Sequence, residues 1–427
     1  MLTICDKLKK INNILIILLI FFIIFSSALN YTHIPFWFSY LKDVIIFYFG
    51  FVLLFNWKDN VKPKINITFF ILFVIVAIIS WLGLYYSTNT GIFTIVSHSM
   101  RYIEFFILFF VFTNLEKICT IKYDKLINLY LILSIILLFV HIFGYFVPND
   151  IVSIYITDKF DHGYYRNRIS VGQPAIAIFP MIISYFYIII FNKFNIKNYI
   201  KIILLLVGII IAIPVTGIIS VFICTIGLLG WSIIKLKKDI IGKILIMVVS
   251  IVITIFVGIL FIKTNPTLNE IYENQKDLLE VKIGSIIGNK VEDPSINIRD
   301  DKFDEVISNN TNIFQDIFGV GKYGYNRGEV NIGNMENSYR IFRVEYGYLG
   351  IALFIIFLFS NILIYIYKSL RDKDNSKKYI FISILFIILA LHAYTLDVIY
   401  LPTISYTISL FYCYVIGENF KDENIDS

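Results

Sequence analysis

Long apolar runs, separated by short polar segments, make up most of the chain. An apolar run of about 18 residues or more is long enough to cross the hydrocarbon core of a bilayer as a helix. We therefore predict an all-α polytopic membrane protein with about twelve transmembrane helices. The predicted spans are 11–29, 36–56, 66–86, 97–114, 126–147, 171–191, 200–214, 217–234, 244–262, 345–367, 379–397 and 402–417.

One long polar stretch interrupts this pattern late in the chain. It divides the sequence into a membrane domain, a loop domain and a second membrane domain, in that order: 1–262, 263–344 and 345–427. Within the loop, apolar positions of Pro266–Ile286 recur at helical spacing, and a second helix is expected to start in Arg299–Ile307. The loop is therefore predicted to be partly helical and to have a function of its own.

Composition agrees with a membrane protein. Of the 427 residues, 58% are hydrophobic and 16% are charged, and the mean hydropathy is +0.77. A soluble protein carries about 25% charged residues. The net charge of +6 comes from lysines that lie beside the spans rather than in one patch, so we expect no nucleic-acid partner.

The basic residues predict the orientation. Lysine and arginine concentrate at both termini and in alternate short loops, which is typical of the cytoplasmic side. The opposite short loops hold few basic residues, namely Arg101, Lys159, Arg166 and Arg168. Both termini are therefore expected in the cytoplasm, and the long loop outside it.

The N-terminal run allows two interpretations. Ser26, Ser27 and Ala28 follow an apolar run and resemble a signal-peptide cleavage site. The run Ile11–Leu29 is long and many spans follow, which favours an uncleaved first span.

No soluble catalytic motif or metal-binding motif is present. The four cysteines, Cys5, Cys119, Cys224 and Cys413, lack metal-ligand spacing, and none lies in a segment predicted to be outside. We expect no metal, no cofactor and no disulfide. An enzyme of this kind must use an already activated substrate that the membrane delivers.

One charged cluster stands where the loop domain meets the next span. Spacings of four and three place Glu336, Arg340 and Arg343 on one helical face, which Gly347 and Gly350 are expected to continue. A carboxylate beside two guanidinium groups could bind a phosphate and accept a proton. The alternative is a salt-bridged helix entry at the level of the lipid headgroups.

Two further clusters lie at the predicted outer ends of spans. Arg166 and Arg168 occur in a charged connection before a span, and this connection could bind phosphate or be a solvated loop. His98, Arg101 and Glu104 share a face, where Arg101 and Glu104 are expected to pair. Weaker signals come from charged residues near other spans: Lys42, Asp43, His392 and Asp397.

Three segments and the topology together resemble the superfamily of Wzy polysaccharide polymerases and O-antigen ligases. The segment Arg166–Pro174 (RNRISVGQP) is similar to the arginine-containing stretch that precedes a span in that family. The segment Arg299–Gly321 is similar to a helix followed by the family's Gly-x-Gly. The third segment, ENSY at Glu336 followed by EYGYLG at Glu345, is the most specific.

The resemblance implies a membrane-embedded, metal-independent glycosyltransferase with a GT-C-like fold. Its substrates would be undecaprenyl-diphosphate-linked glycans at the outer face of the bacterial inner membrane, with a chain-length regulator and a flippase as further partners. Glu336 and Arg340 would be catalytic, and the pyrophosphate would bind arginines: Arg166, Arg168, Arg343 and Arg101.

Two alternatives to a polymerase remain. Ligases carry a histidine where this chain has Glu336, and this departure favours a polymerase. They also usually carry Ser-Arg where this chain has Thr216 and Gly217, so another arginine, Arg340 or Arg343, would have to replace that pyrophosphate-binding residue. A flippase for lipid-linked oligosaccharides would more typically show short loops, charges deep in its spans and related halves. The asymmetric long loop argues against the flippase.

Overall fold

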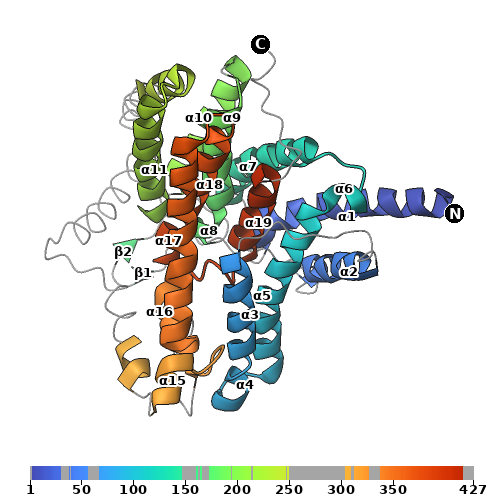
Figure 1. Ribbon diagram of the computed structural model, residues 1–427, viewed down its shortest axis with the longest axis vertical. Coiled ribbons are helices and arrows are strands. Elements are labelled where there is room, and N and C mark those ends of the chain that lie inside the picture. The colour runs from blue at the N-terminus through green and yellow to red at the C-terminus, as the bar shows by residue number, and fades with distance from the viewer. Residues whose placement is uncertain are drawn as a thin grey trace, which may run out of the picture.

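The computed structural model describes most of the chain as helices packed around a buried centre (Figure 1). The described residues are 2–29, 38, 40–55, 67–146, 160–161, 164–165, 173–193, 195–212, 215–246, 248–249, 303–308, 312–326 and 337–416. The part of the loop domain from 263 to 302, which includes the predicted helix Pro266–Ile286, lies outside these residues.

The helices occupy nearly all the predicted spans. The longer helices are α1 (Leu2–Leu29), α2 (Leu41–Phe55), α3 (Ile67–Ser80), α5 (Ile92–Thr113), α7 (Tyr123–Phe146), α9 (Phe179–Phe191), α10 (Ile196–Ile211), α11 (Val215–Ile234), α17 (Gly347–Arg371), α18 (Ser376–Ala393) and α19 (Pro402–Ile416). The predicted span 244–262 lies mostly outside the described residues.

Short helices and strands lie between these longer helices. They are α4 (Gly83–Tyr86), α6 (Leu115–Ile118), α8 (Pro174–Ala177), α15 (Ile313–Phe318), α16 (Ser338–Glu345), β1 (Phe160–Asp161) and β2 (Tyr164–Tyr165). The two strands pair antiparallel and are two residues long each, a small addition to the predicted all-α fold.

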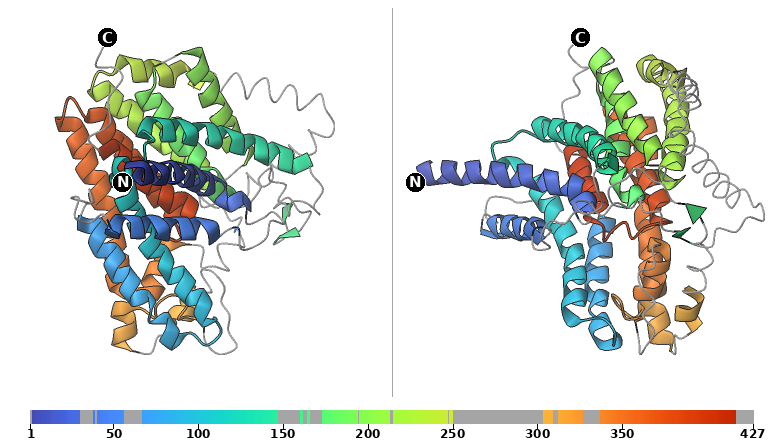
Figure 2. Two further views of the ribbon diagram at one scale, coloured as in Figure 1. Left: turned by 90° about the vertical axis from the view of Figure 1, so that its right-hand side faces the viewer. Right: turned by 180° about the vertical axis from the view of Figure 1, so that it is seen from behind.

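Among the described residues, seven helices are long and apolar enough to cross a membrane. Large apolar side chains on their outer faces are exposed, including Phe70 and Ile78 of α3 and Phe359 of α17. Apolar residues exposed over many turns are typical of lipid-facing surface. The chain is thus a multi-pass, helical membrane protein. Helices α1 and α2 run crosswise to α3, α5 and α17 (Figure 2).

Helix α19 lies at the centre and is buried along Thr403–Val415. Its hydroxyl groups form hydrogen bonds with several surrounding helices: Thr403 with Ser26, Tyr406 with Glu104, Thr407 with Tyr130, Tyr412 with Tyr365 and Tyr414 with Asp124. Because lipid offers little hydrophobic drive for helices to associate, interhelical hydrogen bonds of this kind help to fix the packing.

Aromatic rings fill the space between α3 and its neighbours. The Phe69 ring meets Phe109, Phe357 and Phe386 edge to face, with centroid distances of 4.9, 4.6 and 5.7 Å, and it lies 5.1 Å from Tyr412. Edge-to-face pairs add about 0.5–1.5 kcal/mol beyond the area they bury. This cluster joins α3 to α5, α17, α18 and α19.

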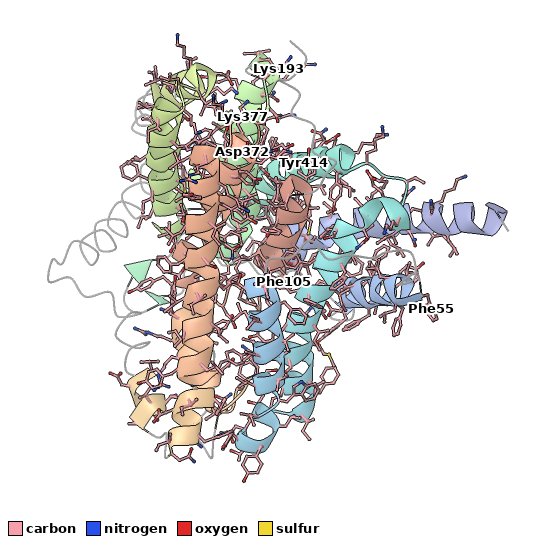
Figure 3. The ribbon with its side chains drawn as sticks, viewed as in Figure 1. Phe55, Phe105, Lys193, Asp372, Lys377 and Tyr414 are labelled. Atoms are coloured by element: carbon pink, nitrogen blue, oxygen red, sulfur yellow. The ribbon has the colours of Figure 1, made fainter. Side chains whose placement is uncertain are left out.

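Hydrogen bonds between distant segments join helix ends that the predicted alternation assigns to the same side. Asn13 bonds Thr120, and Tyr414 bonds Asp124, among ends predicted inside. Ser26 bonds Thr403 among ends predicted outside. Lys193, Lys377 and Asp372, from loops assigned to the inner side, lie in the same half of the molecule (Figure 3). The alternation is thus consistent with the packing, and which side faces the cytoplasm stays a prediction.

The helical face predicted from Glu336 to Gly350 is not continuous, so that expectation was wrong. Helix α16 ends at Glu345, and α17 begins at Gly347, whose φ of +67° breaks the helix. Such a left-handed conformation is open to glycine and costly for other residues. Gly347 and Gly350 therefore do not extend the face that carries Arg340 and Arg343.

Glycines allow the segment before α16 to pack with backbone against backbone. A Cβ atom on Gly319 would lie 2.3 Å from the carbonyl oxygen of Glu345, and one on Gly321 would lie 2.1 Å from the nitrogen of Gly83. Both glycines also have positive φ angles. The segment 319–326 is therefore wedged between α4 and the α16–α17 junction, and side chains larger than hydrogen do not fit there.

We predict that Gly321→Ala destabilises the protein. Its added methyl group meets the Gly83 backbone, and its φ of +74° disfavours alanine, so the cost is about 1–3 kcal/mol or more. Thermal unfolding of the purified chain in detergent measures the effect. Gly227→Ala in α11 is the control, because its Cβ meets nothing within 4 Å. Equal midpoints for the two variants would contradict the close packing.

Candidate functional site

Lys322 lies in the turn of segment 319–326, and backbone hydrogen bonds hold this turn against two helix ends. Its backbone nitrogen donates to the carbonyl oxygen of Ser80 at 3.0 Å, and the nitrogen of Gly321 donates to that of Glu345 at 2.8 Å. These bonds fix the turn to the ends of α3 and α16. They direct the lysine side chain inward.

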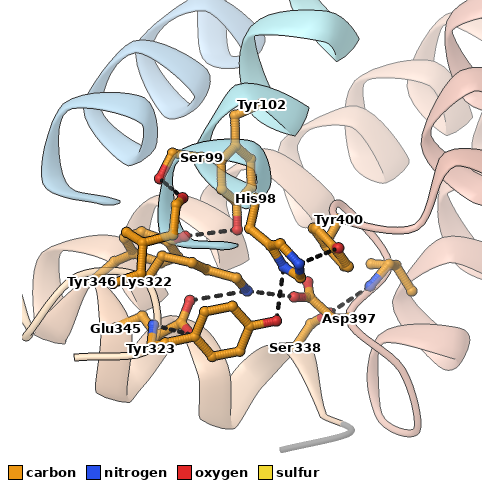
Figure 4. Close-up of polar contacts among 12 residues, drawn as sticks. His98, Ser99, Tyr102, Lys322, Tyr323, Ser338, Glu345, Tyr346, Asp397 and Tyr400 are labelled. Carbon is orange, nitrogen blue, oxygen red and sulfur yellow. Dashed lines mark hydrogen bonds and ion pairs between the residues drawn. The ribbon is translucent and has the colours of Figure 1, made fainter. Parts of the chain in front are cut away.

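The Lys322 ammonium group lies between two carboxylates (Figure 4). Its Nζ is 3.2 Å from Oε2 of Glu345 and 3.0 Å from Oδ2 of Asp397, which precedes α19. The side chains are 2%, 0% and 12% exposed for Lys322, Glu345 and Asp397. We call these three residues the Lys322 cluster. An ammonium group needs such partners, because desolvation of an ion costs several kcal/mol.

The environment shifts the protonation of this cluster. Burial opposes the charge of Lys322, but Asp397 and Glu345 outweigh that effect and raise its pKa. Burial raises the pKa of Glu345 to about 7, although Lys322 opposes the shift. The backbone nitrogen of Tyr323 also donates to Oε1 of Glu345 at 3.2 Å. The two carboxylates thus favour the charged form of Lys322, and burial favours the neutral form of Glu345.

Aromatic side chains surround the ammonium group. The Nζ atom lies 5.1 Å from the Tyr323 ring centroid and 5.0 Å from that of Tyr400, within cation–π range. His98 lies between the two phenols, with Nδ1 2.7 Å from the Tyr323 hydroxyl and Nε2 2.9 Å from the Tyr400 hydroxyl. Both ring nitrogens of His98 are therefore occupied by the hydroxyl groups of these two tyrosines.

A second buried ion cluster lies one helical turn further along α5. Arg101 contacts Asp43 of α2 and Glu104, the latter at 2.8 Å, and Lys42 lies 3.2 Å from Asp43. The Tyr406 hydroxyl donates to Glu104. We call these four charged residues the Arg101 cluster. The predicted pairing of Arg101 with Glu104 is confirmed, and Asp43 is an additional partner that its position in another span concealed.

The predicted pyrophosphate-binding residue Arg343 has a different environment. Its Nη2 is 3.0 Å from Oδ1 of Asp316, and its guanidinium carbon lies 3.8 Å from the ring centroid of Tyr348. Its Nη1 is buried and has no hydrogen-bond partner among the described residues. On the same helix, Arg340 lies over the ring of Phe303, 5.5 Å from its centroid.

The predicted residues do not all meet in one place. Arg340 and Arg343 share α16, whereas Arg101 belongs to a cluster with its own carboxylates. Glu336, Arg166 and Arg168 lie outside the described residues. Among the described residues no group of three or more histidine, cysteine or acidic side chains could hold a metal ion.

Little in the amino-acid sequence indicated the Lys322 cluster. Lys322 stands among glycines and tyrosines in a polar segment, where a lysine is normally solvated. Asp397 is 75 residues away along the chain, so no local spacing links the two. The available signal was the acidic Asp397 in an apolar stretch, since intramembrane or interfacial charges usually have partners.

A scan against protein-family models and a search of the curated proteins found no match to this chain.

We predict that Arg101→Ala destabilises the fold strongly. It leaves Asp43 and Glu104 with only Lys42 as a cation, and removal of one partner from a buried ion pair costs about 3–5 kcal/mol. Thermal unfolding in detergent is the measurement. The exposed lysine variant Lys238→Ala is the control, and a midpoint for Arg101→Ala equal to that of the control would refute a structural role for the pair.

Proposed function

We propose that this chain polymerises undecaprenyl-diphosphate-linked oligosaccharide repeat units. It does so by glycosyl transfer at the outer face of the bacterial inner membrane, with about twelve transmembrane helices, a GT-C-like architecture and both termini in the cytoplasm. The growing glycan leaves its lipid diphosphate and joins a sugar hydroxyl of the next lipid-linked unit. The reaction needs no metal, and its partners include a flippase and a chain-length regulator.

The observation that carries this proposal is the state of Arg343. Its guanidinium group stacks on Tyr348, Asp316 holds one edge, and the buried Nη1 has no acceptor among the described residues. A buried donor without a partner costs about 1–3 kcal/mol, more when it is charged. A phosphate oxygen supplies the missing acceptor and matches the fork of a guanidinium group. Asp316 keeps the fork in one orientation.

The rest of the proposed site follows from α16. Asn337 caps this helix, and its side chain accepts from the nitrogens of Tyr339 and Arg340. Glu336 precedes the cap and is proposed to take the proton of the acceptor hydroxyl. Arg340 stabilises the charge that develops on the leaving diphosphate. Arg166 and Arg168 are proposed to approach from the preceding outer loop.

The Lys322 cluster supports this proposal as a rigid base. It is too deeply buried to touch a glycan in this structure, and Glu345 closes the last turn of α16. A binding group must be held within about 0.5 Å of its productive position by the residues behind it. We propose that the Lys322 cluster holds in this way the helix that carries Arg340 and Arg343.

One observation favours a second candidate, a carrier of lipid-linked oligosaccharides. The Arg101 cluster places charged side chains from two helices within the membrane region. Ionisable groups there often mark the route of a transported substrate. These charges are paired with one another, however, so they also suit a structural role, and the polymerase remains the better-supported candidate.

Loss of the gene should leave a surface capped with single repeat units. Without the polymerase, units are still made, flipped and attached to their final acceptor, so glycans resolved by size show one unit in place of a ladder. Long chains stranded on the lipid carrier would identify a ligase instead. Lipid-linked units confined to the cytoplasmic face would identify a carrier.

Arg343→Lys should reduce polymer formation by at least about tenfold, as should Arg343→Ala. Lysine retains the charge but not the fork, and a hydrogen bond to a charged group is worth about 1.5–3 kcal/mol. The readout is the glycan ladder from cells with equal amounts of each variant. Arg371→Lys, at the C-terminal end of α17, is the matched control. A normal ladder from Arg343→Lys would reject bidentate binding.

A further inference from the structure

The Lys322 cluster holds one more acid than base. One ammonium group lies within 3.2 Å of two carboxyl groups, and all three side chains are largely buried. The Arg101 cluster is different, because two cations there match two carboxylates: Lys42 and Arg101 with Asp43 and Glu104. If both acids of the Lys322 cluster are ionised, a net negative charge remains in a region from which water is excluded.

Among the described residues, no other group that faces the cluster neutralises this charge. From α5 come His98, whose ring nitrogens both meet hydroxyl groups, Tyr102, and Arg101, which already faces Asp43 and Glu104. The other elements that the structure describes around the cluster contribute only phenols: Tyr323 and Tyr325 from the turn, Tyr346 from the α16–α17 junction and Tyr400 from the segment before α19. Burial raises the pKa of these four hydroxyls, so they stay neutral.

The carboxyl oxygens are also incompletely bonded. Among the described residues, Oδ1 of Asp397 and Oε2 of Glu345 are buried and lack a hydrogen-bond partner, although Oε2 lies at ion-pair distance from Lys322. A buried ionised carboxylate with too few donors is costly, and such a group normally takes up a proton instead. Uptake of one proton removes the excess charge and creates a new donor.

We propose that the Lys322 cluster is a proton-binding site, in which Glu345 binds and releases one exchangeable proton. Lys322 and Asp397 then form a balanced ion pair beside the neutral acid. The pKa of Glu345, which burial raises to about 7, agrees with this assignment. The inference that this site binds a proton does not depend on the proposed glycosyl transfer, because such a site fits an enzyme or a carrier.

The proton is coupled to the docking of the turn. Glu345 accepts from the nitrogen of Tyr323, and its own carbonyl oxygen accepts from Gly321, so the same residue binds the proton and the turn. An unfolded glutamate has a pKa of about 4.3. Between that value and about 7 the folded chain binds the extra proton, so this residue makes stability fall as pH rises through that window.

Infrared spectroscopy of the full chain in detergent tests the proposal directly. The absorption of a protonated carboxyl group should be present in mildly acidic buffer, disappear with a midpoint near pH 7 and be absent from Glu345→Gln. Asp239→Asn, which alters a half-exposed acid at the other end of the bundle, should keep the band. A wild-type chain without a titrating carboxyl band overturns the proposal.

Two further variants test the charge balance and do not require Glu345→Gln to fold. Asp397→Asn leaves one acid for Lys322, so the midpoint of Glu345 should fall by about 1–3 pH units. Lys322→Met removes the cation, so the midpoint should rise. An unchanged midpoint in Asp397→Asn would show that the excess acid does not govern the proton, and it would overturn the proposal.

Discussion

The ammonium group of Lys322 is removed from water, and the end of the bundle around it is arranged to compensate for that cost. The compensation comes from Glu345 and Asp397, and from the rings of Tyr323 and Tyr400. The lysine reaches this position only because Gly319 and Gly321 let the backbone approach its neighbours closely. The glycine pattern and the buried ion cluster are therefore parts of one arrangement.

This arrangement separates the buried Lys322 cluster from the arginines that we propose bind the diphosphate. The Lys322 cluster lies behind α16 and fixes its end, whereas Arg340 and Arg343 project from the same helix toward α15 and residues 303–308. A buried, fully packed base limits the motion of the arginines. That arrangement suits a site whose chemistry depends on where positive charge stands when a diphosphate leaves.

The two buried ion clusters differ in what they can do. The Arg101 cluster is balanced and bonds α5 to α2 and, through Tyr406, to the central helix α19. Its two cations match its two carboxylates, so its role is structural in the polymerase that we propose. The Lys322 cluster has an acid in excess, and this imbalance gives it a proton that it can release. Similar residues thus stabilise the fold in the Arg101 cluster and bind a proton in the Lys322 cluster as we propose it.

The sequence by itself determined the helices, because a run of apolar residues in lipid can satisfy its backbone only as a helix. It also determined the pair Arg101–Glu104, since a spacing of three is read along one helix. It could not locate the break at Tyr346, which depends on what packs against Gly347. Only the tertiary structure joined Lys322 to Asp397, because helix packing, and no local pattern, brings residues 75 positions apart to within 3.0 Å.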